Sequence, residues 1–307
     1  MSVLQDKRRS KRVFLGQDGN ALVSLVAINV ILFAILKFLF LVYKVTELNA
    51  DAYYRSVFNW FILPADLSTF AGRPWVLLTY MFTHESVFHL IGNMLWLWVF
   101  GYILQDMTGN RKLAPIYIYG GVTGAFFYIV SYHVFPQLQS ALPAAAFLGA
   151  NAAVMAVAVA TTTLTPDYRI FPMINGGLPL WILTLVYIVI DIASIPAGDP
   201  GKYIAHLSGA GIGALFIYQM RKGNDWGKWM NRFSDWAINL FNPDKKKKNT
   251  AKDDFFYKVK GQPYTKTPNI TQERIDKVLD KINQQGYHKL TNEEKDILRR
   301  AANDGDL

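Results

Sequence analysis

Six apolar stretches of membrane length fill the middle of this chain, and they constrain its fold more than any other feature. A helix that crosses a bilayer needs about 20 apolar residues, because each residue adds about 1.5 Å along the helix axis. The stretches run over residues 21–43, 87–104, 113–135, 145–164, 178–195 and 203–220. The sequence therefore predicts an all-α membrane protein with a six-helix bundle over residues 21–220 and a small helical C-terminal tail.

The charged residues are segregated from these stretches. The chain has a net charge of +9, although 51% of its 307 residues are hydrophobic. Basic residues gather in the flank of residues 1–20, after the second stretch and after the sixth, whereas residues 136–143 carry no charge. By the positive-inside rule we expect a multi-pass protein with both termini in the cytoplasm, most simply in a bacterial inner membrane. No motif that stacks on bases or enters a groove accompanies the positive charge, so we expect no nucleic-acid partner.

The region after the sixth stretch, residues 221–248, predicts a helix that lies in the membrane interface. Its aromatic residues recur at helical spacing, at Trp226, Trp229, Phe233 and Trp236. A soluble core helix is the alternative, but several tryptophans directly after a membrane-length stretch favour the interface. The run Lys245–Lys248 suits an anionic cytoplasmic leaflet, so we expect such a bilayer surface as a partner.

Beyond a polar linker over residues 249–268, residues 269–307 predict a small helical hairpin. Thr291 and Glu294 form a capping box that opens its second helix. Two short helices bury little surface, so the hairpin either docks on a partner or forms a mobile tail.

Polar side chains occur near the start of three of the apolar stretches. His89 and Asn93 are four residues apart and share one helix face, while Asn151 and His206 begin the fourth and sixth stretches. Because successive helices alternate in direction, all three stretches start at the same membrane face. An imidazole in a bilayer is costly unless it faces other helices or water, so these residues predict a functional site. The alternative is a polar clamp that only joins helices.

Small residues surround these polar groups. Gly149 and Ala150 precede Asn151, and Gly209 and Gly213 follow His206 at the spacing of a small-residue ridge. Such ridges let two helices approach closely. We therefore expect the fourth and sixth helices to bring Asn151 and His206 within hydrogen-bonding range.

These motifs resemble those of the rhomboid intramembrane serine proteases, in the order and at the face where that family has them. The matching segments are residues 75–84, the spacing of His84, His89 and Asn93, the run Gly149-Ala150-Asn151-Ala152, and residues 205–209 followed by Gly213. The resemblance covers about residues 21–220. It implies that His206 is a general base and that His89 and Asn93 stabilise an oxyanion, together with a backbone N–H near Gly149 and Ala150. It also implies that residues 136–146 and the fifth helix guard substrate entry.

The chain departs from that family at the position of the catalytic nucleophile, where Asn151 stands in place of serine. An amide has no ionisable nucleophilic oxygen, and neither Ser86, Ser140 nor Ser208 lies in a matching motif. The sequence thus favours an inactive rhomboid that binds transmembrane client proteins.

The alternative is an active rhomboid serine endopeptidase with a Ser-His dyad or an unrecognised nucleophile, so the status as an enzyme stays open. A transporter or channel is less favoured, because paired broken helices and acidic ion ligands are absent from the pattern. With no cysteine in the chain, thiol catalysis and thiolate metal sites are excluded, and we expect no metal or other cofactor.

Overall fold

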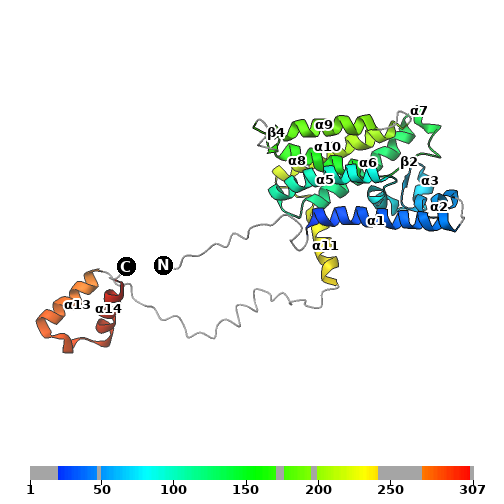
Figure 1. The fold of residues 1–307 in the computed structure, drawn as a ribbon. Helices are drawn as coiled ribbons and strands as arrows, with labels where there is room; N and C mark the ends of the chain where they lie inside the picture. Colours follow the sequence, from blue (N-terminus) through cyan, green and yellow to red (C-terminus); the bar gives the residue numbers. More distant parts are fainter. Residues whose placement is uncertain (1–19, 47–49, 171–175, 195–198, 241–271, 305–307) are drawn as a thin grey trace. The chain divides into compact units, whose positions relative to one another are not determined.

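The computed structural model describes residues 20–46, 50–170, 176–194, 199–240 and 272–304. The chain divides into two compact units, Met1–Phe241 and Asn242–Leu307 (Figure 1). Residues 1–19 of the basic flank, the run Lys245–Lys248 and the expected linker lie outside the described residues.

The first unit has a helix at each place where an apolar stretch was predicted. These helices are α1 (Ala21–Val45), α5 (Val87–Thr108), α6 (Leu113–Val134), α8 (Asn151–Leu164), α9 (Leu180–Ser194) and α10 (Gly201–Arg221). In Figure 1, α9 and α1 lie on opposite sides of the bundle.

Of the described helices, three are long and apolar enough to cross a membrane. These are α1, α5 and α6, with mean hydropathies of 2.8, 1.6 and 1.5. Helices α8 and α9 are apolar but only 14 and 15 residues long. Helix α10 has the length, with 21 residues, but its glycines and polar side chains keep it out of this group. The count of six membrane-crossing helices therefore stays a prediction.

Short elements connect the long helices of this unit. They are α2 (Ala50–Ser56), η1 (Phe58–Trp60), β1 (Leu63–Pro64), α3 (Leu67–Ala71), α4 (Val76–Thr79), η2 (Tyr80–Phe82), α7 (Pro136–Gln139), β2 (Ala146–Phe147), β3 (Arg169–Ile170), β4 (Leu178–Pro179) and α11 (Lys228–Leu240).

Helix α8 forms the centre of the bundle, with α10 and α6 packed against it. A Cβ atom added to Gly209 would lie 2.3 Å from the carbonyl oxygen of Ala152, and one added to Gly213 would lie 2.2 Å from that of Ala156. Glycine is needed at both positions because the backbones of α8 and α10 touch there. The close approach predicted from the small-residue ridge is confirmed.

The segment before α8 is extended, not helical. Phe147 pairs with Leu63 in the antiparallel pair β1–β2, and the backbone N–H of Ala65 donates to the carbonyl oxygen of Ala145 at 3.0 Å. Gly149 then turns the chain with a φ of +102°, and α8 begins at Asn151. The prediction of a helix from residue 145 was wrong, because these strand hydrogen bonds hold the backbone extended.

The second unit contains the expected helical hairpin, made of α13 (Gln272–Gln285), η3 (Tyr287–Lys289) and α14 (Asn292–Asp304). The capping box is confirmed: the N–H of Glu294 donates to Thr291 Oγ1 at 3.3 Å, and the N–H of Thr291 donates to Glu294 Oε2 at 2.8 Å. Lys281 Nζ on α13 also donates to Glu294 Oε1 at 2.8 Å, which joins the two helices.

Candidate functional site

The amide oxygen of Asn151 accepts two short hydrogen bonds from α5. His89 Nε2 lies 2.7 Å from Asn151 Oδ1, and Asn93 Nδ2 donates to the same oxygen at 2.6 Å. Helix α5 can present both donors because it is capped just before them, where Ser86 Oγ accepts from the N–H of His89 at 3.1 Å. His89 and Asn93 thus share one face of α5, as predicted, and the structure shows that both contact Asn151.

A carboxylate that the sequence analysis missed joins the rest of the site. Asn151 Nδ2 donates to Asp191 Oδ1 at 3.1 Å, and His206 Nδ1 lies 2.6 Å from Asp191 Oδ2. The side chains of His206 and Asp191 are only 3% and 4% exposed. Asn151 and His206 thus meet on the two oxygens of one carboxylate, and this differs from the direct contact that we expected across α8 and α10.

The carboxylate determines which nitrogen of His206 carries a proton. A carboxylate only accepts hydrogen bonds, so Nδ1 donates to Asp191, and in the neutral imidazole Nε2 then keeps a lone pair. The ring also packs against Phe147, with 5.8 Å between ring centroids. This arrangement orients an imidazole as a general base requires.

The backbone before Asn151 is tightly constrained. A Cβ atom at Gly149 would lie 2.5 Å from His89 Cε1, so this position needs glycine for space as well as for its positive φ. The N–H of Gly149 donates to the carbonyl oxygen of Tyr80 at 3.0 Å and is already used in the fold. Ala150 is fully buried and precedes the first residue of α8.

His84 lies beside the site without joining its hydrogen bonds. Its ring stands edge-on to that of His89, with 5.3 Å between centroids, and its Nδ1 lies 3.4 Å from the carbonyl oxygen of Phe82. In this position His84 supports the orientation of the His89 ring by packing.

A cavity of about 260 Å³ opens onto these groups between α5 and α9. Its lining combines polar and apolar side chains: Phe88, His89, Asn93, Trp96, Asn151, Tyr187, Ile190 and Asp191, with the backbone of Gly92. The polar groups of the site can therefore be reached from between these two helices.

The serines considered as substitute nucleophiles have other roles. Ser208 Oγ donates to the carbonyl oxygen of Ala205 on its own helix at 2.7 Å, and Ser86 caps α5. Ser140 ends α7. In the described part of the chain, no group of three or more His, Cys, Asp or Glu side chains is placed to hold a metal ion.

The fold and site together define the class: a helical membrane protein with a buried imidazole–carboxylate–amide network at the start of two helices. Residues 71–223 match the Rhomboid domain. The chain belongs to the rhomboid family. Residues 262–304, which include the C-terminal hairpin, match a family of unknown function, DUF6576.

Several curated proteins share the rhomboid region. RHOMBOID-like protein 12, mitochondrial, of Arabidopsis thaliana is 29% identical over 163 residues, which cover 50% of this chain and 48% of that protein. Presenilin-associated rhomboid-like protein A, mitochondrial, of Danio rerio is 32% identical over 141 residues, covering 44% and 35%. Rhomboid protein 1, mitochondrial, of Saccharomyces cerevisiae is 28% identical over 146 residues, covering 46% and 40%. The chain thus spans about half or less of the length of these relatives.

Their names correct one expectation from the sequence. These relatives are mitochondrial, which contradicts the expected location in a bacterial inner membrane with both termini in the cytoplasm. The positive-inside rule predicts orientation from the basic loops, so it carries no information about which membrane holds the protein.

Proposed function

We propose that this rhomboid-family membrane protein binds transmembrane client helices without cutting them. The observation that carries the proposal is the state of Asn151. Its side chain stands at the nucleophile position, and its Oδ1 is engaged by both His89 and Asn93. These are the donors that would otherwise stabilise an oxyanion, and Asn151 already occupies both of them.

The chemistry of an amide supports an inactive site. A nucleophile that a histidine activates must offer a hydroxyl or a thiol, and Asn151 offers neither. Its nitrogen donates to Asp191 and has no basic lone pair for attack on a carbonyl. Ser86 caps α5, Ser140 ends α7, and Ser208 donates to the carbonyl oxygen of Ala205 on its own helix, and the chain has no cysteine.

The surfaces of α5 and α9 support client binding. Around the cavity, α5 exposes Phe88, Ile91 and Leu95, while α9 exposes Val186 and Ile190. These apolar side chains would face lipid in the six-helix bundle that we propose for the bilayer, and a client helix could replace that lipid. An unwound turn of the client could then reach the polar groups at the cavity floor.

One observation favours the alternative, an active serine endopeptidase, for a close variant of this chain. Asp191 holds His206 in the orientation and tautomer of a general base, although no hydroxyl is present to use it. A serine at position 151 would supply the missing group while freeing His89 and Asn93 as donors.

The test is to restore serine. In reconstituted bilayers with a helix-destabilised transmembrane substrate, the unmodified chain should cross-link to the substrate and leave it intact. Asn151→Ser should cleave it and react with a fluorophosphonate probe, because loss of the nucleophile lowers kcat by about 10⁶-fold in a serine protease.

Two controls separate the possible outcomes. Asn151→Ser combined with His206→Ala should neither cleave nor react, while Asn151→Ala should still cross-link. Cleavage by the unmodified chain that disappears with His206→Ala would refute the proposal, as would failure to cross-link any transmembrane substrate.

A further inference from the structure

A second pocket lies far along α5 from the site, where α11 meets the loop between α5 and α6. This loop, residues 109–112, joins two helices that are each long and apolar enough to cross a membrane. A connection between two such helices must lie at a membrane face, because its backbone polar groups cannot be satisfied in hydrocarbon. The pocket therefore lies at the depth of lipid headgroups.

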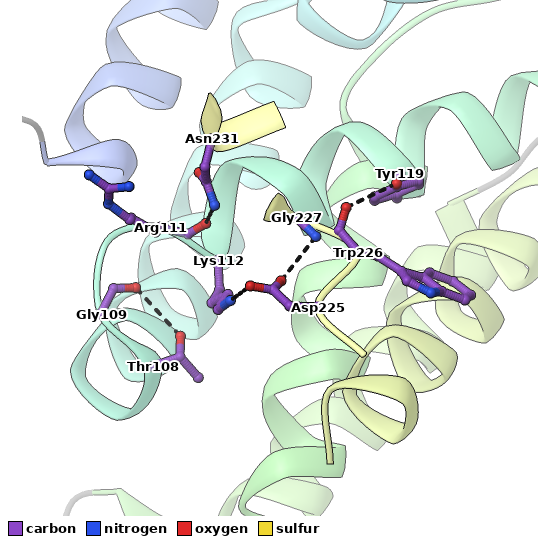
Figure 2. Close-up of polar contacts among 9 residues, drawn as sticks. All are labelled: Thr108, Gly109, Arg111, Lys112, Tyr119, Asp225, Trp226, Gly227 and Asn231. Carbon is purple, nitrogen blue, oxygen red and sulfur yellow. Dashed lines mark hydrogen bonds and ion pairs between the residues drawn. The ribbon is translucent and has the colours of Figure 1, made fainter. Parts of the chain in front are cut away.

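Helix α11 is docked on this loop by its polar side (Figure 2). Asn231 Nδ2 donates to the carbonyl oxygen of Arg111 at 3.1 Å, and Lys112 forms an ion pair with Asp225 just before the helix. Tyr119 on α6 anchors the same segment, since its hydroxyl donates to the carbonyl oxygen of Trp226 at 3.2 Å. These contacts hold α11 in one orientation.

That orientation leaves an aromatic face of α11 uncovered. Trp229, Phe233 and Trp236 are spaced along one side of the helix and are 59%, 62% and 57% exposed. Aromatic side chains at this spacing are typical of a helix that lies in the membrane interface. The prediction of an amphipathic pattern after α10 is consistent with this exposure.

The pocket itself has a volume of about 470 Å³ and an excess of positive charge. Its charged lining consists of four basic and two acidic side chains: Arg111, Lys112, Lys228, Arg232, Asp225 and Asp235. Lys112 pairs with Asp225, and Arg111 Nη1 lies 3.1 Å from Asp235 Oδ2. Among the described residues, Lys228 and Arg232 form no ion pair, and they lie one turn apart on α11.

We propose that this pocket binds the phosphate of an anionic phospholipid, with Lys228 and Arg232 as its main ligands. A guanidinium and an ammonium one helical turn apart can contact one phosphate from two sides. The aromatic face beside them suits the upper acyl chains of the same lipid, which a free phosphate ion in water would not need. The position at a membrane face and the neighbouring aromatic surface together favour a lipid over a free phosphate ion as the ligand.

The experiment uses the full chain in detergent micelles, with native mass spectrometry as the readout. Phosphatidylglycerol and phosphatidylcholine are added in turn, and the fraction of protein that retains a lipid is measured. The unmodified chain should retain phosphatidylglycerol in preference to phosphatidylcholine. Lys228→Gln and Arg232→Gln should each weaken that retention about fivefold, and the double variant about 25-fold.

Lys44→Gln is the matched control. It removes the same charge near the far end of α1, whose first turn lies beside Gly101 of α5. It should leave retention unchanged. The conservative Arg232→Lys should keep most of it, which separates loss of charge from loss of folding.

Three results would overturn the proposal. They are equal retention of both lipids, unchanged retention in both single variants, and release of phosphatidylglycerol by millimolar inorganic phosphate, which would assign the pocket to a free anion. If the double variant does not fold, the single variants decide the question.

Discussion

The buried site and the α11 pocket both join helices through an acid–base pair, but in opposite surroundings. The side chains of Asp191 and His206 are 4% and 3% exposed, whereas those of Arg111 and Asp235 are 68% and 51% exposed. In the interior an unpaired polar group is costly, and Asp191, Asn151 and His206 are joined to one another by hydrogen bonds. At the surface water competes for the same groups, so an ion pair adds little to stability. The same interaction therefore specifies the fold in one place and leaves charge available for ligands in the other.

The largest effect should come from breaking the buried pair. Asp191→Ala leaves His206 Nδ1 and Asn151 Nδ2 without their acceptor, and removing one partner of a buried pair costs about 3 kcal/mol of unfolding free energy. Equilibrium unfolding in mixed micelles would measure it. Asp191→Asn keeps one acceptor and should lose less. A loss below about 1 kcal/mol for Asp191→Ala would show that water replaces the carboxylate.

A smaller effect should come from the packing that brings the polar groups together. Gly209→Ala places a methyl group 2.3 Å from the carbonyl oxygen of Ala152, so α8 and α10 must separate at a cost of about 2 kcal/mol. Gly211→Ala is the matched control, since no atom lies within 4 Å of its added Cβ. It should stabilise α10 slightly by helix propensity. Equal losses in the two variants would rule out backbone contact as the cause.

The exposed pair at α11 should contribute least to unfolding free energy. Arg111→Ala should cost about 0.5 kcal/mol and lose its effect at high salt, because the pair with Asp235 is open to solvent. A double-mutant cycle with Asp235→Ala would isolate the pair. A coupling above about 1.5 kcal/mol would contradict the comparison between the two regions.

In the C-terminal hairpin, stability should depend on pH through the carboxylate of Glu294. The hydrogen bond from Lys281, assisted by the N–H of Thr291, lowers the pKa of Glu294 from 4.5 to about 2. The folded state therefore binds this proton less readily than the unfolded state. The stabilisation is fully present above pH 4.5 and is lost as the pH falls towards 2.

Hydrogen-exchange protection of α13 and α14 in the full chain would measure this loss. Glu294→Gln should remove the acid dependence. Glu273→Gln is the control, because its pair with Lys277 is highly exposed and should leave the dependence intact. A hairpin equally protected at pH 2.5 and pH 6, at about matched ionic strength, would contradict the role of Glu294.

Much of the site could be predicted from the sequence because its residues are tied to helix starts. His89, Asn93, Asn151 and His206 each lie within the first two turns of a helix, and three apolar stretches begin at one face. Helix periodicity and alternating direction were enough to group them. The role of Gly209 and Gly213 could also be predicted, because a close contact between two helices leaves no room for a side chain.

Asp191 was not predicted because it lies near the far end of α9, in a stretch that matches no motif. A signal was present: a carboxylate within an apolar stretch is costly and implies a polar partner. The start of α8 was also unpredictable from local pattern. Residues 145–147 are all apolar, and only pairing with β1, more than eighty residues earlier in the chain, makes them extended.

The shortness of α9 has a consequence for the surrounding lipid in the six-helix bundle that we propose. Its 15 residues rise about 22 Å, against a hydrocarbon thickness of about 30 Å. Helix α8 is as short, but it is enclosed by α5, α6 and α10, whereas α9 exposes Leu185, Val189 and Ile190. The mismatch at α9 would therefore favour a bilayer that is locally thinned beside it. A client helix that fits an ordinary bilayer would have part of its apolar length outside the hydrocarbon in this thinner zone. The backbone hydrogen bonds of that part would open most readily.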